Sequence, residues 1–174
     1  MVLLHIKKYP EPILRKKSEE VGEITEEIKN LVFNMAETLK ESGGMGLAAP
    51  QIGESKRIII INSTKEIIKE EKDEKGYEVF INPKITSKGG EIEVMEEGCL
   101  SFPGIYLNIK RQKTVEVSAL DVNGNQVRLT AEGLLARIFQ HEIDHLNGVL
   151  IIDRINFFQK LKTLIRFKIK SRKI

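Results

Sequence analysis

Residues 132–148 read EGLLARIFQHEIDHLNG, and this stretch identifies the central element of the fold. Its apolar residues recur at helical spacing, and Gly148 is typical of the position just beyond a helix C-terminus. The spacing therefore predicts a helix from about Glu132 to Asn147. Apolar side chains also surround the polar segment near its centre, which indicates a buried helix; they are Ile138, Phe139, Ile143 and Leu146.

Two histidines lie four residues apart in the segment HEIDH (141–145). On a helix, positions i and i+4 share a face with their Cβ atoms about 5–6 Å apart. His141 and His145 can therefore bind one metal ion at about 2.0–2.1 Å. Glu142 lies next to the first histidine and can act as a general base on a water at the metal ion. A chance occurrence on a solvated face is a poor alternative, because two of the chain's 3 histidines lie in this motif.

The sequence offers two candidates for the third metal ligand. Metal hydrolases usually supply three protein ligands and leave one position to water, and no histidine follows His145. Asp153 is one candidate, and Cys99 in the segment EEGCLSFPG (96–104) is the other. Cys99 is the only cysteine, so it has no disulfide partner within the chain and is either a small buried residue or a reactive or ligating group. The incomplete two-histidine site favours Cys99 as the ligand.

The segment GGMGLAAPQ (43–51) is a third chemical feature. Its glycine, alanine and proline residues let a substrate backbone approach without obstruction, and the Gln51 amide can donate to a developing oxyanion. An ordinary connection between a helix and a strand explains these residues equally well, since glycine-rich loops are common. A phosphate-binding loop is excluded, because no GK[ST] follows.

The remaining segments place many strands between helices. Thr25 suits the N-cap of a helix over 25–40 that stops at Gly43, and another helix is expected to begin near Asn156. Strands are predicted over 57–62, which is buried on both faces, and over 77–81, 91–95, 114–120 and 126–131. Because strands and helices do not alternate, a doubly wound sheet is excluded. We expect an α+β fold, with short, largely antiparallel strands around the central HExxH helix, an N-terminal helix and a C-terminal helix.

Composition indicates the class of protein. A chain of 174 residues with 41% hydrophobic and 30% charged residues is the size of one domain with a packed core, so we expect a single catalytic domain over 1–174. No apolar run reaches the roughly 20 residues of a membrane span, and the N-terminus lacks the features of a signal peptide. These features predict a cytoplasmic protein that binds neither DNA nor membrane. The charge-dense residues 63–76 are expected to form an exposed loop.

The chain ends in a basic segment. Residues 156–174 are expected to form an amphipathic helix and tail, and its final residues include no acid and five basic side chains: Arg166, Lys168, Lys170, Arg172 and Lys173. Either this helix docks on the domain by its aromatic face and leaves its basic side in solvent, or the basic residues contact phosphates of an RNA. Such contacts would make binding strongly salt-dependent.

Three segments, in this order, resemble the motifs of peptide deformylases: GMGLAAPQ (44–51), EGCLS (97–101) and QHEIDH (140–145). The resemblance extends over nearly the whole chain. It implies a hydrolase that removes the formyl group from the N-terminal formylmethionine of newly synthesised polypeptides and releases formate. It also implies one divalent metal ion per chain, with Fe²⁺ expected and Zn²⁺, Ni²⁺ or Co²⁺ as alternatives, since imidazole and thiolate accept all four.

The resemblance also implies which residues perform the reaction. Glu142 would take a proton from a water at the metal ion and pass it to the departing amine. The Gln51 amide and the Leu100 backbone N–H would hold the formyl oxygen as it becomes negative. The metal ion itself would be bound by Cys99, His141 and His145.

Further residues would bind the substrate. Gly46 would hydrogen-bond the peptide backbone. Some relatives carry an aliphatic residue at the position of Arg137, so the sequence does not decide which residues form the outer rim of the methionine pocket. Glu97 invites a salt bridge to a basic residue such as Arg111 that would fix the ligand loop. The methionine side chain would lie in an apolar pocket whose candidate residues are Met45, Met95, Leu134 and Ile138.

The resemblance implies that the C-terminal helix contacts ribosomal RNA near the polypeptide exit, and we expect a monomer. A general zinc endopeptidase would share the HExxH motif, but EGCLS and the lack of a third downstream histidine disfavour it. A ribosome-binding protein with a structural metal site would explain the basic tail, although the intact Glu142 argues against a degenerate site.

Overall fold

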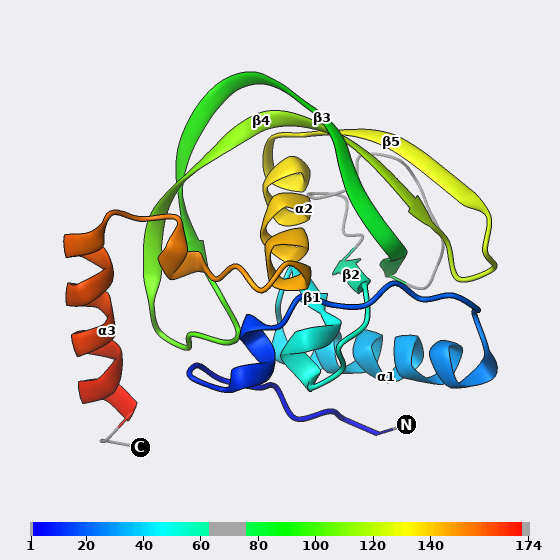
Figure 1. Ribbon diagram of the computed structural model, residues 1–174, viewed down its shortest axis with the longest axis horizontal. Coiled ribbons are helices and arrows are strands. Elements are labelled where there is room, and N and C mark those ends of the chain that lie inside the picture. The colour runs from blue at the N-terminus through cyan, green and yellow to red at the C-terminus, as the bar shows by residue number, and fades with distance from the viewer. Residues whose placement is uncertain (1, 63–75, 172–174) are drawn as a thin grey trace.

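Helix α2 (Gly133–Leu146) lies beneath an arch of β-strands in the computed structural model (Figure 1). The structure describes residues 2–62 and 76–171. The other helical elements are the 3₁₀ helix η1 (Pro12–Arg15), α1 (Glu26–Ser42), the 3₁₀ helices η2 (Ala49–Ile52) and η3 (Ile151–Asp153), and α3 (Phe157–Ser171). The strands are β1 (Gly46–Ala48), β2 (Ile58–Asn62), β3 (Tyr77–Gly98), β4 (Tyr106–Leu120) and β5 (Gln126–Glu132). The central helix predicted over 132–147 is confirmed by α2.

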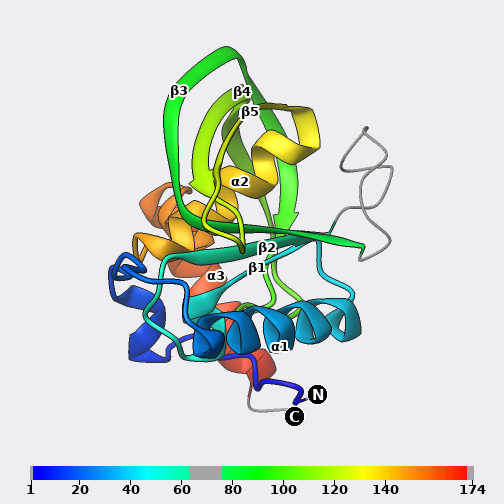
Figure 2. The same cartoon turned by 90° about the vertical axis from the view of Figure 1, so that its right-hand side faces the viewer.

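Strand β2 supports two apolar cores. The strands of the described residues form one antiparallel sheet in the order β1-β2-β3-β4-β5. Ile59 and Ile61 of β2 belong to the apolar cluster of α2, whereas Ile58 and Ile60 belong to that of α1. All four are fully buried, and Figure 2 shows α1 and α2 on opposite sides of β1 and β2. Because successive side chains of a strand point to opposite faces, the isoleucine run is buried on both faces, as predicted.

Strands β3 and β4 are longer than the sequence predicts. The strands expected over 77–81 and 91–95 are two parts of β3. The pairing of β3 with β4 shifts register at three points between Ile81 and Ile92. Irregularities of this kind bend and twist a strand pair. Strand β2 pairs with β3 only over 77–81, so the far end of β3 and the start of β4 form a two-stranded arm. We call 92–98 and 106–112 the β3–β4 arm. The α+β class is confirmed, but the strands are not all short.

Helix α1 begins and ends where its sequence signals predict, and α3 docks on the domain through Phe167 but not through the aromatic pair at its start. The Thr25 hydroxyl accepts a hydrogen bond from the Ile28 backbone N–H at 3.5 Å, and Gly43 ends α1 with a φ of 65°. Helix α3 lies beside the arch (Figure 1) and contributes Phe167 to an apolar cluster with η3. Phe157 and Phe158 are 72% and 81% exposed, so the aromatic pair at its start does not dock on the domain.

Some sequence predictions concern residues that the structure does not describe. The expected loop over 63–76 lies outside the described residues except for Gly76. The same holds for residues 172–174 of the basic tail. Among the helices that the structure describes, none is long and apolar enough to cross a membrane.

Candidate active site

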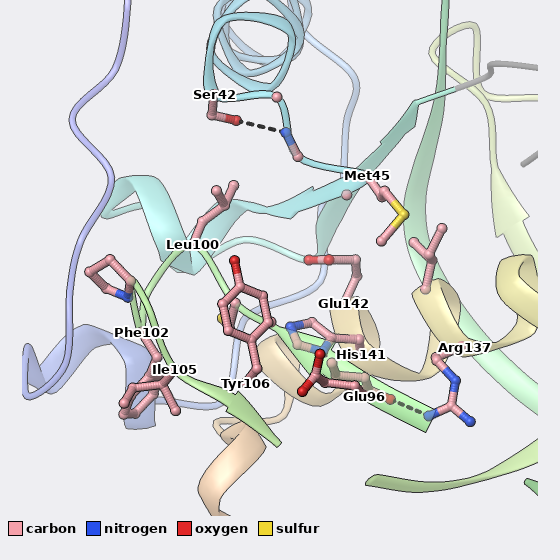
Figure 3. A pocket seen from close by; sticks show the side chains of 18 of the residues that line it. Ser42, Met45, Glu96, Leu100, Phe102, Ile105, Tyr106, Arg137, His141 and Glu142 are labelled. Atoms are coloured by element: carbon pink, nitrogen blue, oxygen red, sulfur yellow. Dashed lines mark hydrogen bonds and ion pairs between the residues drawn. The ribbon is translucent and has the colours of Figure 1, made fainter. Parts of the chain in front are cut away.

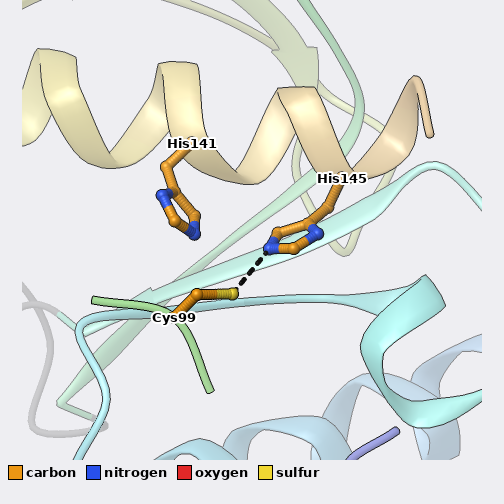
Figure 4. A group of neighbouring side chains, drawn as sticks. All are labelled: Cys99, His141 and His145. Atoms are coloured by element: carbon orange, nitrogen blue, oxygen red, sulfur yellow. Dashed lines mark hydrogen bonds between the residues drawn. The ribbon is translucent and has the colours of Figure 1, made fainter. Parts of the chain in front are cut away.

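Cys99, His141 and His145 come together between the end of β3 and helix α2 (Figure 4). Their donor atoms all lie within 4.8 Å of one another, and Cys99 Sγ is 3.3 Å from His145 Nε2. Donors around a tetrahedral ion with the bond lengths typical of sulfur and nitrogen ligands are about 3.5 Å apart. The residues therefore fit one divalent metal ion held by a thiolate and two imidazoles.

The surroundings of Cys99 favour the thiolate form of its side chain. Burial opposes its ionisation, but the neighbouring His145 and hydrogen bonds with both histidines outweigh burial and hold the pKa of the thiol well below its usual value. The thiolate is the form of cysteine that binds metal ions. Cys99 directly follows β3, and the two histidines lie one turn apart on α2 with ring centres separated by 5.1 Å. The site is thus assembled from two elements that are distant in sequence.

Glu97 orients the ring of His141. His141 Nδ1 lies 2.9 Å from Glu97 Oε2, which leaves Nε2 as the nitrogen available to a metal ion. The carboxylate also accepts two hydrogen bonds from Arg111 at 3.0 Å, which confirms the predicted salt bridge. Burial raises the pKa of Glu97, but hydrogen bonds from His141 and Arg111 outweigh it and lower the pKa to about 2. Glu97 is therefore ionised at neutral pH.

Glu142 lies beside the metal ligands with part of its carboxylate unpaired. The residue is 4% exposed, and its Oε2 has no hydrogen-bond partner among the described residues. Burial raises the pKa of the carboxyl group, and the charges of the two histidines only partly oppose this effect. The side chain also lies against Gly46, where a Cβ atom would be 2.6 Å from Glu142 Oε1. A side chain at position 46 would therefore overlap with Glu142.

The Gln51 amide is fixed at both of its polar atoms. Its Oε1 accepts a hydrogen bond from the Ala48 backbone N–H at 2.8 Å. Its Nε2 donates to Ser101 Oγ at 3.3 Å and lies 3.8 Å from Cys99 Sγ. Because the carbonyl oxygen is already used by its own loop, the NH₂ group is directed at the metal ligands. Ser101 was not predicted as a site residue, and its only signal in the sequence is its place within EGCLS.

A pocket of about 470 Å³ opens beside these groups (Figure 3). Cys99, His141 and Glu142 line it, so a molecule in the pocket reaches both a metal ion and a carboxylate. Gly46 and Leu100 line it as well. The pocket also contains all of the residues expected around a methionine side chain: Met45, Met95, Leu134 and Ile138. Further lining residues were missed, and their only signal is that they lie close to the motifs in sequence: Ser42, Ile105 and Tyr106.

Comparison with known proteins assigns the chain to a family. The family model described as polypeptide deformylase matches residues 3–161. The chain belongs to the polypeptide deformylase family. It is an enzyme of that family, a metal-dependent hydrolase that removes the formyl group from nascent peptides.

Deformylases from several bacteria resemble the chain over nearly its full length. The peptide deformylase of Thermodesulfovibrio yellowstonii is 44% identical over 173 residues, which is 99% of this chain and 100% of that protein. A crystal structure of the Ehrlichia chaffeensis peptide deformylase in complex with actinonin superimposes with a TM-score of 0.89 at 40% identity and covers 99% of both chains. The Thermotoga maritima structure gives a TM-score of 0.81 at 41% identity and covers 90% of this chain and 99% of that one.

The sequence left the roles of Asp153 and Arg137 undecided. In the structure of this deformylase, Asp153 is not near the metal ligands and Arg137 does not present a free charge at the pocket rim. Asp153 is not among the clustered donors; it pairs with Arg15, and it accepts hydrogen bonds from Lys160 at 2.6 Å and from the Leu150 backbone N–H at 2.9 Å. Arg137 lines the pocket but is only 4% exposed, because its guanidinium turns to Glu97. Its charge is therefore paired and does not face solvent at the pocket rim.

Proposed function

We propose that this deformylase binds one divalent metal ion through Cys99, His141 and His145 and cleaves the formyl amide of N-formylmethionyl peptides at that ion. The observation that carries the proposal is the convergence of three donor atoms within 4.8 Å on a pocket that also holds an unpaired carboxylate. A divalent ion bound there supplies Lewis-acid chemistry, because it polarises a carbonyl oxygen and makes water more acidic.

Glu142 is the general base and acid of the proposed reaction. Its raised pKa suits a group that must accept a proton from water and then release it to the departing amine. Its burial keeps the carboxylate from being solvated by bulk water, and its unpaired Oε2 leaves an acceptor for the proton. The contact with Gly46 limits where the carboxylate can lie.

Gln51 and Leu100 hold the formyl oxygen as it becomes negative. The Gln51 Nε2 group is preorganised, since Ala48 and Ser101 fix the amide before any substrate arrives. Leu100 follows the ligand Cys99 and lines the pocket, so its backbone N–H lies next to the metal ligands. Two donors aimed at one oxygen stabilise the charged transition state more than the neutral substrate.

The pocket selects methionine by its shape and chemistry. Met45, Met95, Leu134 and Ile138 give it an apolar lining that an unbranched thioether side chain can fill. Gly46 hydrogen-bonds the peptide backbone. A removed formyl group leaves as formate, and the deformylated peptide leaves with a free methionine amine.

The native metal ion in this proposal is Fe²⁺. A donor set of one thiolate and two imidazoles also accepts Zn²⁺, Ni²⁺ and Co²⁺, so metal content must be measured on protein purified without oxygen. An iron content near one per chain with high specific activity supports Fe²⁺. Full activity with zinc alone in protein purified this way would refute it.

The proposed reaction is tested by formate release from formyl-Met-Ala. Glu142→Gln keeps the volume of the side chain but removes the base, and we expect it to lower kcat by about 10²–10⁴-fold while metal content stays unchanged. Glu41→Gln, which neutralises an exposed acid at the end of α1, is the matched control and retains wild-type kcat. Acetyl-Met-Ala and an unformylated peptide test for general peptidase activity. Absence of formate release by metal-loaded wild type would overturn the proposal.

The basic side of α3 contacts ribosomal RNA in this proposal, which places the enzyme near emerging formylated chains. Lys162, Arg166 and Lys168 are exposed, whereas Lys160 pairs with Asp153. Reversal of the three exposed charges to glutamate is expected to abolish co-sedimentation with ribosomes at low salt, with unchanged activity on formyl-Met-Ala. Unchanged co-sedimentation of this variant would refute the contact.

The remaining proposals concern the state of the protein. We propose a cytoplasmic monomer whose residues 1–174 form one catalytic domain. The family match over 3–161 and the full-length similarity to the Thermodesulfovibrio deformylase support one domain. Light scattering at micromolar concentration tests the monomer, and a mass of two chains would refute it.

A further inference from the structure

Helix α2 buries a polar stripe beneath the β3–β4 arm. Arg137, Gln140 and Asp144 lie at positions i, i+3 and i+7 of the helix, so they share one face. They are only 4%, 5% and 8% exposed. Buried polar side chains are usually hydrogen-bonded. All three have partners here, although Arg137 Nε has none among the described residues, and they contact the arm in different ways.

Two members of the stripe join the helix to the arm without touching Glu97. The Gln140 amide exchanges hydrogen bonds with the backbone of Gln112: its Oε1 accepts from N–H at 3.2 Å and its Nε2 donates to C=O at 2.9 Å. Asp144 accepts a hydrogen bond from Arg111 of the arm, and both of its oxygens also accept hydrogen bonds from Arg154, which lies outside the arm. These contacts fix the register of α2 against the arm.

Arg137 contacts Glu97, which in turn contacts His141 of the metal site. Its guanidinium donates to Glu97 Oε1 at 2.6 Å and to the backbone carbonyls of Ile109 and Glu93 at 3.0 Å each. The two carbonyls belong to the two strands of the arm. The guanidinium is therefore held by the backbone and can move little, and it holds the carboxylate in turn.

The four donors around Glu97 divide equally between its two oxygens. Oε1 accepts from Arg111 Nε and Arg137, and Oε2 accepts from the other end of Arg111 and faces His141 Nδ1. Arg111 is shared, because it also pairs with Asp144. Without Arg137, the orientation of Glu97 would depend on an arginine that a second carboxylate also attracts.

We propose that Arg137 is a positioning residue for the metal site, which acts through Glu97 to fix the ring of His141. The proposal rests on the metal ligands proposed above. Figure 3 shows Arg137 at the opposite end of the pocket from Phe102 and Ile105, on the helix that carries His141. Arg137 thus stabilises the ligand geometry without being a ligand and without contributing a free charge to the pocket.

Metal affinity tests this role without relying on turnover. The dissociation constant for Zn²⁺ is measured by competition with a chromophoric chelator, and the absorption bands of bound Co²⁺ report ligand geometry. Replacement of groups that orient metal ligands typically lowers metal affinity by about 10–100-fold. We expect Arg137→Met to weaken Zn²⁺ binding by about 10-fold and to shift the Co²⁺ bands. Arg137→Lys keeps a charge beside Glu97 and restores part of the affinity.

Gln140→Leu is the matched control, because it removes a buried contact of α2 with the arm but none with Glu97. It is expected to lower the free energy of unfolding while the Zn²⁺ dissociation constant stays within twofold of wild type. The second control is Glu97→Gln, on whose background Arg137→Met adds no further loss of affinity if Arg137 acts through Glu97. If Arg137→Met does not fold, Arg137→Gln takes its place in each comparison.

Several outcomes would overturn the role of Arg137. They are wild-type Zn²⁺ affinity in Arg137→Met, an equal loss in Gln140→Leu, or an undiminished effect of Arg137→Met on the Glu97→Gln background. Failure of the wild-type protein to bind any metal ion is a different result, because it would refute the proposed ligand set itself.

Discussion

Replacement of Gly46 by alanine places a methyl group where the Glu142 side chain lies. An ideal Cβ at position 46 would be 2.6 Å from Glu142 Oε1 and 2.9 Å from both Cδ and Cγ. Non-bonded carbon atoms pack best at about 3.5–4.0 Å. Because three atoms of one side chain are too close, rotation of the terminal carboxylate alone does not relieve the overlap, and Glu142 as a whole must move by about 0.5–1 Å.

A displacement of this size should affect the chemical step. A misplacement of about 1 Å can lower the rate by about 10²-fold, so we expect kcat of Gly46→Ala to fall by about 10–100-fold. This corresponds to a rise in the activation free energy of about 1.4–2.7 kcal/mol. The metal content should not change, because the three atoms nearest to the new methyl group all belong to Glu142 and none belongs to a metal ligand.

The assay is formate release from formyl-Met-Ala, with kcat and KM determined separately and metal content measured on the same sample. Gly22→Ala is the matched control, because a Cβ at position 22 meets nothing within 4 Å. It should keep wild-type kcat and KM. A normal kcat in metal-loaded Gly46→Ala would refute the reasoning, and so would a rise in KM alone, which would mean that position 46 acts only on the bound peptide.

Three further predictions concern stability. Phe139 is fully buried with its ring centre 4.8 Å from that of Phe80, so Phe139→Ala should lower the free energy of unfolding by about 3–5 kcal/mol in urea titrations; a loss below 1 kcal/mol would contradict this packing. Burial raises the pKa of Asp153, but Arg15 and Lys160 outweigh it and lower the pKa to about 2. The folded pKa is thus below the unfolded one, so Asp153 stabilises the fold by about 1 kcal/mol near neutral pH, after allowance for solvent screening, and this contribution is lost as pH falls from about 4 to about 2. Asp153→Asn should flatten the stability profile in that range, and an unchanged profile would argue against the ion pair. Removal of the metal ion with a chelator should lower the thermal midpoint by about 5–10 °C, as measured by calorimetry, and an unchanged midpoint would indicate that no ion binds the folded state.

Features that depend on near neighbours in the chain can be predicted from the sequence. The two histidines of HEIDH share a helix face because the helical repeat alone brings positions i and i+4 together. The isoleucine run of β2 is buried on both faces, which its lack of alternation indicates. The same local signals place Thr25 before α1 and Gly43 at its end.

The length of β3 and β4 is not readable from local patterns. Residues 82–90 include Pro83, Gly89 and Gly90, which normally indicate a break between strands. In the structure, irregular pairing with β4 continues through this segment, so one bent strand replaces two short ones. A strand's extent depends on hydrogen bonds to its partner, and the partner is distant in sequence.

Helix α2 is buried as predicted, but the partners of its polar face cannot be predicted from its own sequence. Arg137, Gln140 and Asp144 have the spacing of a solvated helix face, yet the β3–β4 arm covers them. The arm supplies backbone carbonyls to Arg137, the Gln112 backbone to Gln140 and the Arg111 side chain to Asp144. The pattern of one helix does not contain that information.

The choice of third metal ligand shows where local sequence stops and tertiary structure takes over. Asp153 is near His145 in the chain, but η3 directs its carboxylate to Arg15 and Lys160. Cys99 is 46 residues from His145, yet the antiparallel arm brings it to within 3.3 Å. The helical repeat is enough to align two histidines, whereas a third donor can meet them only through the pairing and bending of β3 and β4, which long-range contacts control.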